Sequence, residues 1–265
     1  MIAVVVLTHN RAHLLRQCIE NVLQRASLAT SEILIWDNAS TDGTGELLDA
    51  LDDPRIRVVR HPRNIGLSAY AAAFDRTSAE YVVQVDDDVI DAPPMWDRTL
   101  LYAFRRLPEV GFLAADLEDD PHDEAAYARY HVRPHLYTPF ELHGVRLLEG
   151  PAGGGCAITT RDLIRRAGTF HRRRRKGVFF DVDAAYNDDI RRLGYREAVL
   201  ADLRVHHAGG AYYSLPSAER QEFWDAYWRV QARKAAVKRV LLRLPLVRPL
   251  NDRYRLFEPP AYGQS

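Results

Sequence analysis

The stretch Ala3-Val-Val-Val-Leu-Thr-His-Asn-Arg11 decides the fold class of this 265-residue chain. Its first five residues form a continuous aliphatic run, which predicts a strand buried on both faces. The next four residues are polar, so the strand ends in side chains that can contact a ligand. A strand of this kind is typical of the parallel sheet of an α/β domain.

An apolar strand followed by a helix recurs through the first half of the chain. Strands are predicted over Ala3–Leu7, Glu32–Trp36, Ile56–Val59 and Tyr81–Val85, and helices over His13–Gln24, through Leu47, Leu48 and Leu51, and over Ser68–Phe74. This alternation predicts a parallel sheet wound by right-handed crossovers. We therefore expect an α/β fold of the Rossmann type, with a mostly parallel sheet flanked by helices.

The second half of the chain is less regular. A helix is predicted over Met95–Arg106, a strand over Val110–Ala115, a solvated acidic loop over Asp116–Glu124, a helix over Val182–Leu193 that ends at Gly194, and a long helix over Ser217–Leu244. We expect residues 1–210 to form the α/β domain and residues 211–265 to form a helical C-terminal extension.

Composition sets aside several classes of protein. The 36 basic and 36 acidic residues give no net charge, which argues against a general nucleic-acid binder. Cys18 and Cys156 are the only cysteines, so we expect no disulfide framework and place both thiols in the core. No apolar run reaches the length of a membrane span and no signal peptide is visible, so we expect a cytoplasmic protein.

Polar residues follow each of the four predicted strands of the first half. In open parallel sheets, ligands bind beyond the carboxyl ends of the strands. The four segments are Thr8 to Arg11, Asp37-Asn38, Arg63 to Gly66, and Asp86 to Asp88. Each alone could be an ordinary cap, turn or exposed loop. Their convergence on one edge of one sheet favours a binding site.

The run Asp86-Asp87-Asp88 is the most informative of these segments. Adjacent carboxylates repel each other unless a cation or hydrogen bonds compensate. We expect Asp86 and Asp88 to project to one side and Asp87 to the other. Two carboxylates on one side suit Mg²⁺ or Mn²⁺, and the alternative is an exposed acidic turn. The dinucleotide fingerprint, the P-loop and the hydrolase nucleophile elbow are all missing from the sequence.

The four segments together resemble the family 2 glycosyltransferases, which have the GT-A fold. The resemblance rests on Val4–Arg11, Asp37–Thr44, Arg63–Leu67 and Val85–Asp88 and spans about residues 1–210. It implies a nucleotide-binding half over residues 1–90 and an acceptor half over residues 91–210. By this resemblance, the nucleotide sugar is bound by Thr8, Asn10, Arg11, Asp37, Arg63, Asn64, Gly66, Asp86 and Asp87.

The resemblance also implies a divalent cation, Mn²⁺ or Mg²⁺. Asp86 and Asp88 match the D-x-D pair whose bound cation bridges the donor diphosphate. The segment His206-His207 resembles the late histidine segment of the family, in which one imidazole can complete the metal shell. The spacing favours His207 over His206, and only one of two adjacent side chains can reach the site. A structural histidine is the alternative.

For the catalytic base, the resemblance points to the stretch Phe179-Phe-Asp-Val-Asp183. Asp181 is the first choice and Asp183 the second, with Asp188 and Asp189 as outside candidates. A helix N-cap is the alternative role of Asp181. Phe180 stands where the family has a glutamate.

The implied activity is a metal-dependent, inverting transfer of a sugar from a nucleoside diphosphate sugar, UDP-sugar by family frequency. The acceptor would be a glycan, a lipid-linked saccharide or a small molecule, lying against Gly153 and Gly154 unless these form an ordinary bend. Two alternatives stay open: a non-catalytic nucleotide-sugar binding protein, suggested by Phe180, and a sugar nucleotidyltransferase. The basic segment Arg229–Arg248 could contact an anionic membrane surface, the catalytic domain or a second subunit in a homodimer.

Overall fold

The first half of the chain forms four parallel strands. The structure, a computed structural model, describes residues 1–66, 68–118, 134–171, 182–208, 229 and 241. The strands are β1 (Ile2–Thr8), β2 (Thr30–Asp37), β3 (Ile56–Arg60) and β4 (Tyr81–Asp86), and they lie side by side in the order β3-β2-β1-β4. Each contains its predicted strand and extends it by at most two residues at either end. Because all four run in the same direction, their polar carboxyl ends meet at one edge.

The second half completes a mixed sheet. Its strands are β5 (Val89–Asp91), β6 (Val110–Glu118), β7 (Thr138–Leu142), β8 (Val145–Glu149), β9 (Cys156–Thr160) and β10 (Arg196–His207). The full order is β3-β2-β1-β4-β9-β6-β10-β8-β7, with β5 paired to β10. The mostly parallel sheet is confirmed, and within it β9 runs antiparallel to both β4 and β6, whereas β10 is parallel to β6.

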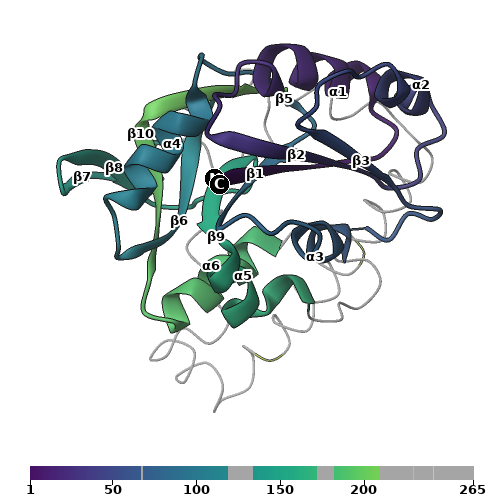
Figure 1. Ribbon diagram of the computed structural model, residues 1–265. Coiled ribbons are helices and arrows are strands. Elements are labelled where there is room, and N and C mark those ends of the chain that lie inside the picture. Colours follow the sequence, from purple (N-terminus) through teal and green to yellow (C-terminus); the bar gives the residue numbers. More distant parts are fainter. Residues whose placement is uncertain (67, 119–133, 172–181, 209–228, 230–240, 242–265) are drawn as a thin grey trace. The chain divides into compact units, whose positions relative to one another are not determined.

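Helices cover both faces of the sheet, as Figure 1 shows. They are α1 (Ala12–Cys18), α2 (Thr44–Asp49), α3 (Ser68–Phe74), α4 (Trp96–Arg105), α5 (Arg161–Ala167) and α6 (Val182–Arg192), with the short π-helix η1 (Ile19–Leu23) and the short 3-10 helices η2 (Pro134–Leu136) and η3 (Thr169–His171). The bounds of α3 are those expected. The single helix predicted over His13–Gln24 is instead α1 followed by the π-helical η1, and Leu51 lies beyond the end of α2.

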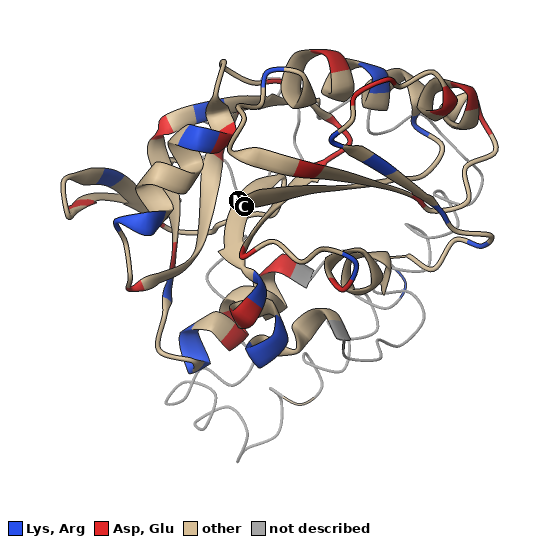
Figure 2. Cartoon of the chain, viewed as in Figure 1, with Lys and Arg blue, Asp and Glu red and all other residues tan. Residues whose placement is uncertain are grey.

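Alternation along the strands separates two apolar layers. Val4 and Val6 of β1 pack in the core that contains residues of α1, α2 and α4, whereas Val5 packs in the core that contains residues of α3, α5 and α6. All three valines are fully buried, as a strand covered on both faces requires. Figure 2 shows the charged residues mainly on helices and loops, with few on the central strands.

The acidic stretch predicted to be a solvated loop begins inside β6, and the carboxylate of Asp116 is buried there with an ion pair to Arg204. The helix predicted over Ser217–Leu244 lies outside the described residues, apart from Arg229 and Leu241. Cys18 and Cys156 are buried as expected. Among the described helices, none is long and apolar enough to cross a membrane.

Candidate active site

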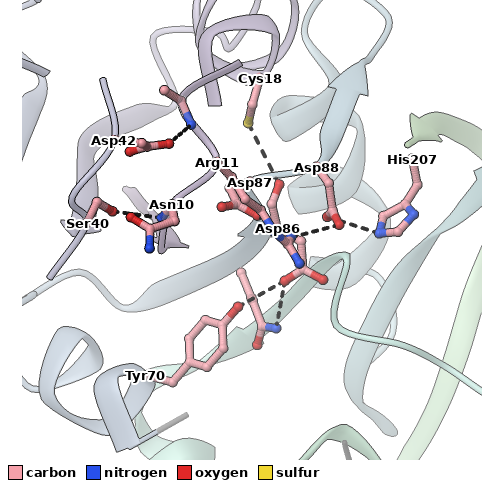
Figure 3. Close-up of polar contacts among 12 residues, drawn as sticks. Asn10, Arg11, Cys18, Ser40, Asp42, Tyr70, Asp86, Asp87, Asp88 and His207 are labelled. Carbon is pink, nitrogen blue, oxygen red and sulfur yellow. Dashed lines mark hydrogen bonds and ion pairs between the residues drawn. The ribbon is translucent and has the colours of Figure 1, made fainter. Parts of the chain in front are cut away.

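Asp86, Asp88 and His207 form a cluster where β4 and β10 end (Figure 3). One ligand atom from each of the three side chains lies within 4.8 Å of the others. Asp88 Oδ1 lies 3.1 Å from His207 Nε2, and both side chains are buried. The backbone fixes this approach, because Ala208 N donates to the carbonyl oxygen of Asp88 and His207 pairs with Val89 of β5.

The cluster fits a divalent cation by its donor chemistry. Carboxylate oxygens and one imidazole nitrogen are ligands that Mn²⁺ accepts readily, and Mg²⁺ favours the carboxylates. Asp88 Oδ1 is fully buried, and apart from its ion pair with His207 it accepts no hydrogen bond of good geometry from the described residues, so a cation between the two side chains would satisfy it. His207 belongs to the cluster, whereas His206, its half-buried neighbour, pairs through its backbone with Asp91. Adjacent residues of a strand point to opposite faces, which separates the two histidines.

Arg11 compensates the two buried carboxylates after Asp86. Its Nη1 donates to Asp87 Oδ1 at 2.8 Å and to Asp88 Oδ2 at 3.0 Å. Burial raises the pKa of Asp87 to about 6, although Arg11 acts in the opposite direction. Burial also opposes ionisation of Asp88, but His207 and Arg11 outweigh it and lower the pKa of Asp88. The unequal environments keep Asp88 ionised beside His207.

Asp86 is held from the opposite side by two donors that the sequence analysis did not single out. Tyr70 Oη donates to Asp86 Oδ1 at 2.9 Å, and Gln84 Nε2 lies 3.5 Å from the same oxygen. Burial and then the charge of Asp88 raise the pKa of Asp86. Burial and the charges of Asp86 and Asp183 raise the pKa of Tyr70 well above its usual value, so its hydroxyl stays protonated.

The residues after β1 and β2 interlock. Asn10, at a left-handed φ of 54°, accepts a hydrogen bond from Thr41 N at 2.7 Å, and its own N donates to Ser40 Oγ at 3.0 Å. Ser40 N donates to Asp37 Oδ1 at 2.9 Å. Asp37 is 5% exposed and Thr8 is 1% exposed, so both side chains are buried at this edge of the sheet.

Asn38 joins the end of β2 to the segment after β3. Its Nδ2 donates to Asn64 Oδ1 at 2.8 Å, and its Oδ1 accepts from Ile65 N at 3.0 Å. Gly66 adopts a φ of 59°, and its N donates to Asn64 Oδ1. Arg63, in contrast, has an exposed side chain. Asn38 is buried, so it connects the two segments rather than forming an exposed turn.

The glycine segment before β9 meets the start of α6. Gly154 N donates to Asp183 Oδ2 at 2.9 Å. A Cβ on Gly154 would lie 2.5 Å from Gln84 Nε2 and 2.6 Å from Asp183 Oδ1, so only glycine fits. Asp183 is thereby placed close to the hydrogen-bonded pair Tyr70 and Asp86, and its charge contributes to the raised pKa of Tyr70. Gly153 is half-buried, and Asp181 lies outside the described residues.

Asp188 and Asp189, the remaining candidates for the catalytic base, contact neighbouring side chains of the fold. Asp188 is exposed and forms an ion pair with Arg191. Asp189 is buried, accepts a hydrogen bond from Thr169 and forms an ion pair with Arg192 at 2.8 Å. Both lie more than one helical turn beyond Asp183. The two ion pairs lie within α6, and the hydrogen bond from Thr169 connects α6 to η3.

The fold is that of the GT-A glycosyltransferases, and a model of the family described as Glycosyl transferase family 2 matches residues 3–168. The chain belongs to this family. It is 37% identical over 94 residues to the glycosyltransferase GlyG of Streptococcus pneumoniae, which covers 34% of this chain and 31% of that protein.

Two solved structures share the fold. The TarS structure of S. aureus has a TM-score of 0.57 and 16% identity, covering 78% of this chain and 60% of that one. The mannosyltransferase PcManGT of Pyrobaculum calidifontis, solved with GDP-Man and Mn²⁺, has a TM-score of 0.55 and 22% identity, covering 78% and 56%. The chain spans only 24% and 31% of the length of the first curated relatives it matches.

Proposed function

We propose that the chain is a metal-dependent glycosyltransferase that moves a sugar from a nucleoside diphosphate sugar to an acceptor hydroxyl. The observation that carries the proposal is the group formed by Asp86, Asp88 and His207, whose ligand atoms lie within 4.8 Å of one another. This group lies at the strand edge to which Arg11 and Asp37 also belong. Membership of Glycosyl transferase family 2 supports the same reaction class.

In this proposal, Asp86, Asp88 and His207 hold Mn²⁺ or Mg²⁺. A bound cation would neutralise the charge that develops on the departing diphosphate. The base and ribose of the nucleotide would lie against the loop that Asn10 and Asp37 organise. The mannosyltransferase structure holds GDP-Man and Mn²⁺ and a TarS structure holds UDP, which supports a nucleotide sugar as donor. We propose UDP-sugar for this chain, by the family resemblance.

The transfer would proceed by direct displacement. The acceptor oxygen attacks the anomeric carbon as its bond to the diphosphate breaks, and the hydroxyl proton passes to a carboxylate. Asp183 or Asp181 would be that carboxylate, and the placement of Asp183 against Gly154 favours an acceptor bound beside this glycine segment. One displacement inverts the configuration at the anomeric carbon.

Release of nucleoside diphosphate tests the proposal. The chain is incubated with UDP-, GDP- and dTDP-sugars and a mixture of saccharide acceptors, with Mn²⁺ or with EDTA. We expect one donor to be consumed with Mn²⁺ only, and Asp88→Asn to lower the rate about 100-fold or more. Asp91→Asn is the matched control, because Asp91 is exposed and pairs with Arg25 outside the cluster.

Two results would contradict the proposal. Binding of a nucleotide sugar without turnover under any condition would favour a binding protein that lacks transferase activity. Formation of pyrophosphate from a nucleoside triphosphate and a sugar phosphate would favour a nucleotidyltransferase.

A further inference from the structure

Each carboxylate of the metal cluster has one oxygen that accepts from donors outside the cluster. Arg11 donates to Asp88 Oδ2, whereas two side chains donate to Asp86. Both Tyr70 Oη and Gln84 Nε2 approach Oδ1, at 2.9 Å and 3.5 Å. Figure 3 shows Tyr70 reaching Asp86 from the side away from His207. Because Oδ1 accepts from these donors, we expect Asp86 to offer Oδ2 to a cation shared with Asp88 and His207.

We propose that Tyr70 is a positioning residue that orients Asp86 as a metal ligand. The inference rests on the proposed function and adds to it a residue that touches neither cation nor sugar. Carboxylate ligands bind metals tightly when a hydrogen bond fixes their rotation, because the ordering cost is then met before the metal arrives. Tyr70 supplies such a hydrogen bond to a half-buried carboxylate.

The ring of Tyr70 is itself fixed by packing. The side chain is 5% exposed, its ring stacks on Phe74 with centroids 5.7 Å apart, and it lies 6.3 Å from Phe170 in a tilted arrangement. These contacts involve ring carbons and do not need the hydroxyl. Tyr70→Phe therefore removes the donor to Asp86 and keeps the packing of α3 against η3.

Gly154 makes room for the second donor. A Cβ at this position would lie 2.5 Å from Gln84 Nε2, so the absence of a side chain lets the amide lie close to Asp86. Tyr70 comes from α3 and Gln84 from β4, so two different elements donate hydrogen bonds to the carboxylate of Asp86. These hydrogen bonds orient Asp86, whereas Arg11 and His207 orient Asp88.

The helix that carries Tyr70 also follows the segment proposed to bind nucleotide. Ala69 N donates to the carbonyl oxygen of Gly66 at 3.1 Å, and Asn38 Nδ2 donates to the same carbonyl at 3.3 Å. The hydroxyl of Tyr70 itself contacts only the metal ligand among the contacts that the structure describes. Its removal should therefore weaken nucleotide binding with Mn²⁺ present and leave binding without Mn²⁺ unchanged.

The matched control is Tyr186→Phe. Tyr186 is as deeply buried, its ring also contacts Phe170, and its hydroxyl shares a hydrogen bond with Thr159 at 2.8 Å. Tyr186→Phe also removes a tyrosine hydroxyl from the same apolar layer, but the hydroxyl of Tyr186 contacts Thr159 and not Asp86. Any effect that both variants share is structural.

The experiment measures Mn²⁺ binding to the full chain by electron paramagnetic resonance, and UDP and GDP binding by calorimetry with and without Mn²⁺. We expect Tyr70→Phe to raise the Mn²⁺ dissociation constant about tenfold, and Tyr186→Phe to leave it within about twofold. We also expect excess Mn²⁺ to restore nucleotide binding by Tyr70→Phe. Unchanged Mn²⁺ affinity in folded Tyr70→Phe would overturn the positioning role alone.

The two proposals can fail separately. If the wild-type chain binds no Mn²⁺, the metal-dependent function and the role of Tyr70 both fall. If Tyr70→Phe does not fold, Gln84→Met removes the other donor, and a smaller loss of Mn²⁺ affinity is expected. Unchanged affinity in Gln84→Met would then contradict the orientation of Asp86 by donors to Oδ1.

Discussion

Arg11 Nη1 lies 2.8 Å from Asp87 Oδ1 and so joins the end of β1 to the acidic turn after β4. The same nitrogen lies 3.0 Å from Asp88 Oδ2, and both carboxylates are nearly fully buried. Side-by-side carboxylates in a core are tolerated only when opposite charge or hydrogen bonds compensate them. The acidic turn therefore depends on Arg11 whether or not a cation is bound.

Loss of Arg11 should destabilise the fold. Arg11→Met leaves Asp87 and Asp88 without their guanidinium, and we expect the free energy of unfolding to fall by about 2–4 kcal/mol in EDTA at pH 7.5. Arg63→Met is the control, because the side chain of Arg63 is exposed, and a change within about 0.5 kcal/mol is expected. Urea titrations measure both. Equal stability of Arg11→Met and wild type would show that the turn does not rely on this ion pair.

Gly154 should not tolerate a side chain. The Cβ of Gly154→Ala would meet Gln84 Nε2 at 2.5 Å and Asp183 Oδ1 at 2.6 Å, so we expect a loss of about 1–3 kcal/mol and displacement of one of these groups. For Gly45→Ala in α2, no atom of the described residues lies within 4 Å of the added Cβ, and we expect the substitution to stabilise the fold by up to about 1 kcal/mol. Thermal unfolding of the two variants gives the comparison, and equal melting temperatures would contradict the crowding at Gly154.

Asp183 should matter for transfer and Asp188 should not. Asp183→Asn keeps a side chain that can accept from Gly154 N but cannot take a proton, so we expect turnover to fall about 100-fold or more with donor affinity unchanged. Asp188→Asn loses an exposed ion pair with Arg191 and should retain wild-type turnover. If Asp181→Asn alone abolishes turnover, the base is Asp181 and Asp183 has only a structural role.

Neither thiol should react in the folded protein. Burial raises the pKa of Cys18 and Cys156, so neither forms a reactive thiolate at pH 8. We expect a thiol reagent to label no cysteine in native buffer and both in guanidinium chloride. Rapid labelling of a native thiol would place Cys18 or Cys156 outside the core.

The first half of the fold could be predicted from local pattern because its contacts are those of consecutive βα units. Aliphatic runs such as Val4 to Leu7 can be buried only in a covered sheet, and the α/β fold class is confirmed. In the second half, the helices predicted over Met95–Arg106 and Val182–Leu193 and the strand predicted over Val110–Ala115 correspond to α4, α6 and β6. The strand order of this half could not be predicted, because β9 pairs antiparallel with β4 and β6, and such pairing leaves no trace in the sequence of Cys156–Thr160. The same holds for Asp116, whose burial depends on β10.

The candidate site was predictable where polar residues follow strands. Asp86, Asp88 and His207 meet as the resemblance implies, although their role as ligands stays a prediction. Tyr70 and Gln84 were missed because each lies in an apolar pattern, where a hydroxyl or amide has no distinguishing spacing. Both side chains reach Asp86 because of the way α3 and β4 pack, and this packing is visible only in the three-dimensional structure.

The most direct test of the account locates Mn²⁺ by anomalous diffraction from crystals grown with Mn²⁺ and a nucleoside diphosphate. We predict one strong peak about 2.0–2.4 Å from carboxylate oxygens of Asp86 and Asp88 and from His207 Nε2, with phosphate oxygens completing the shell. A fully occupied nucleotide with no peak between these three side chains, or with Mn²⁺ bound elsewhere, would contradict the account.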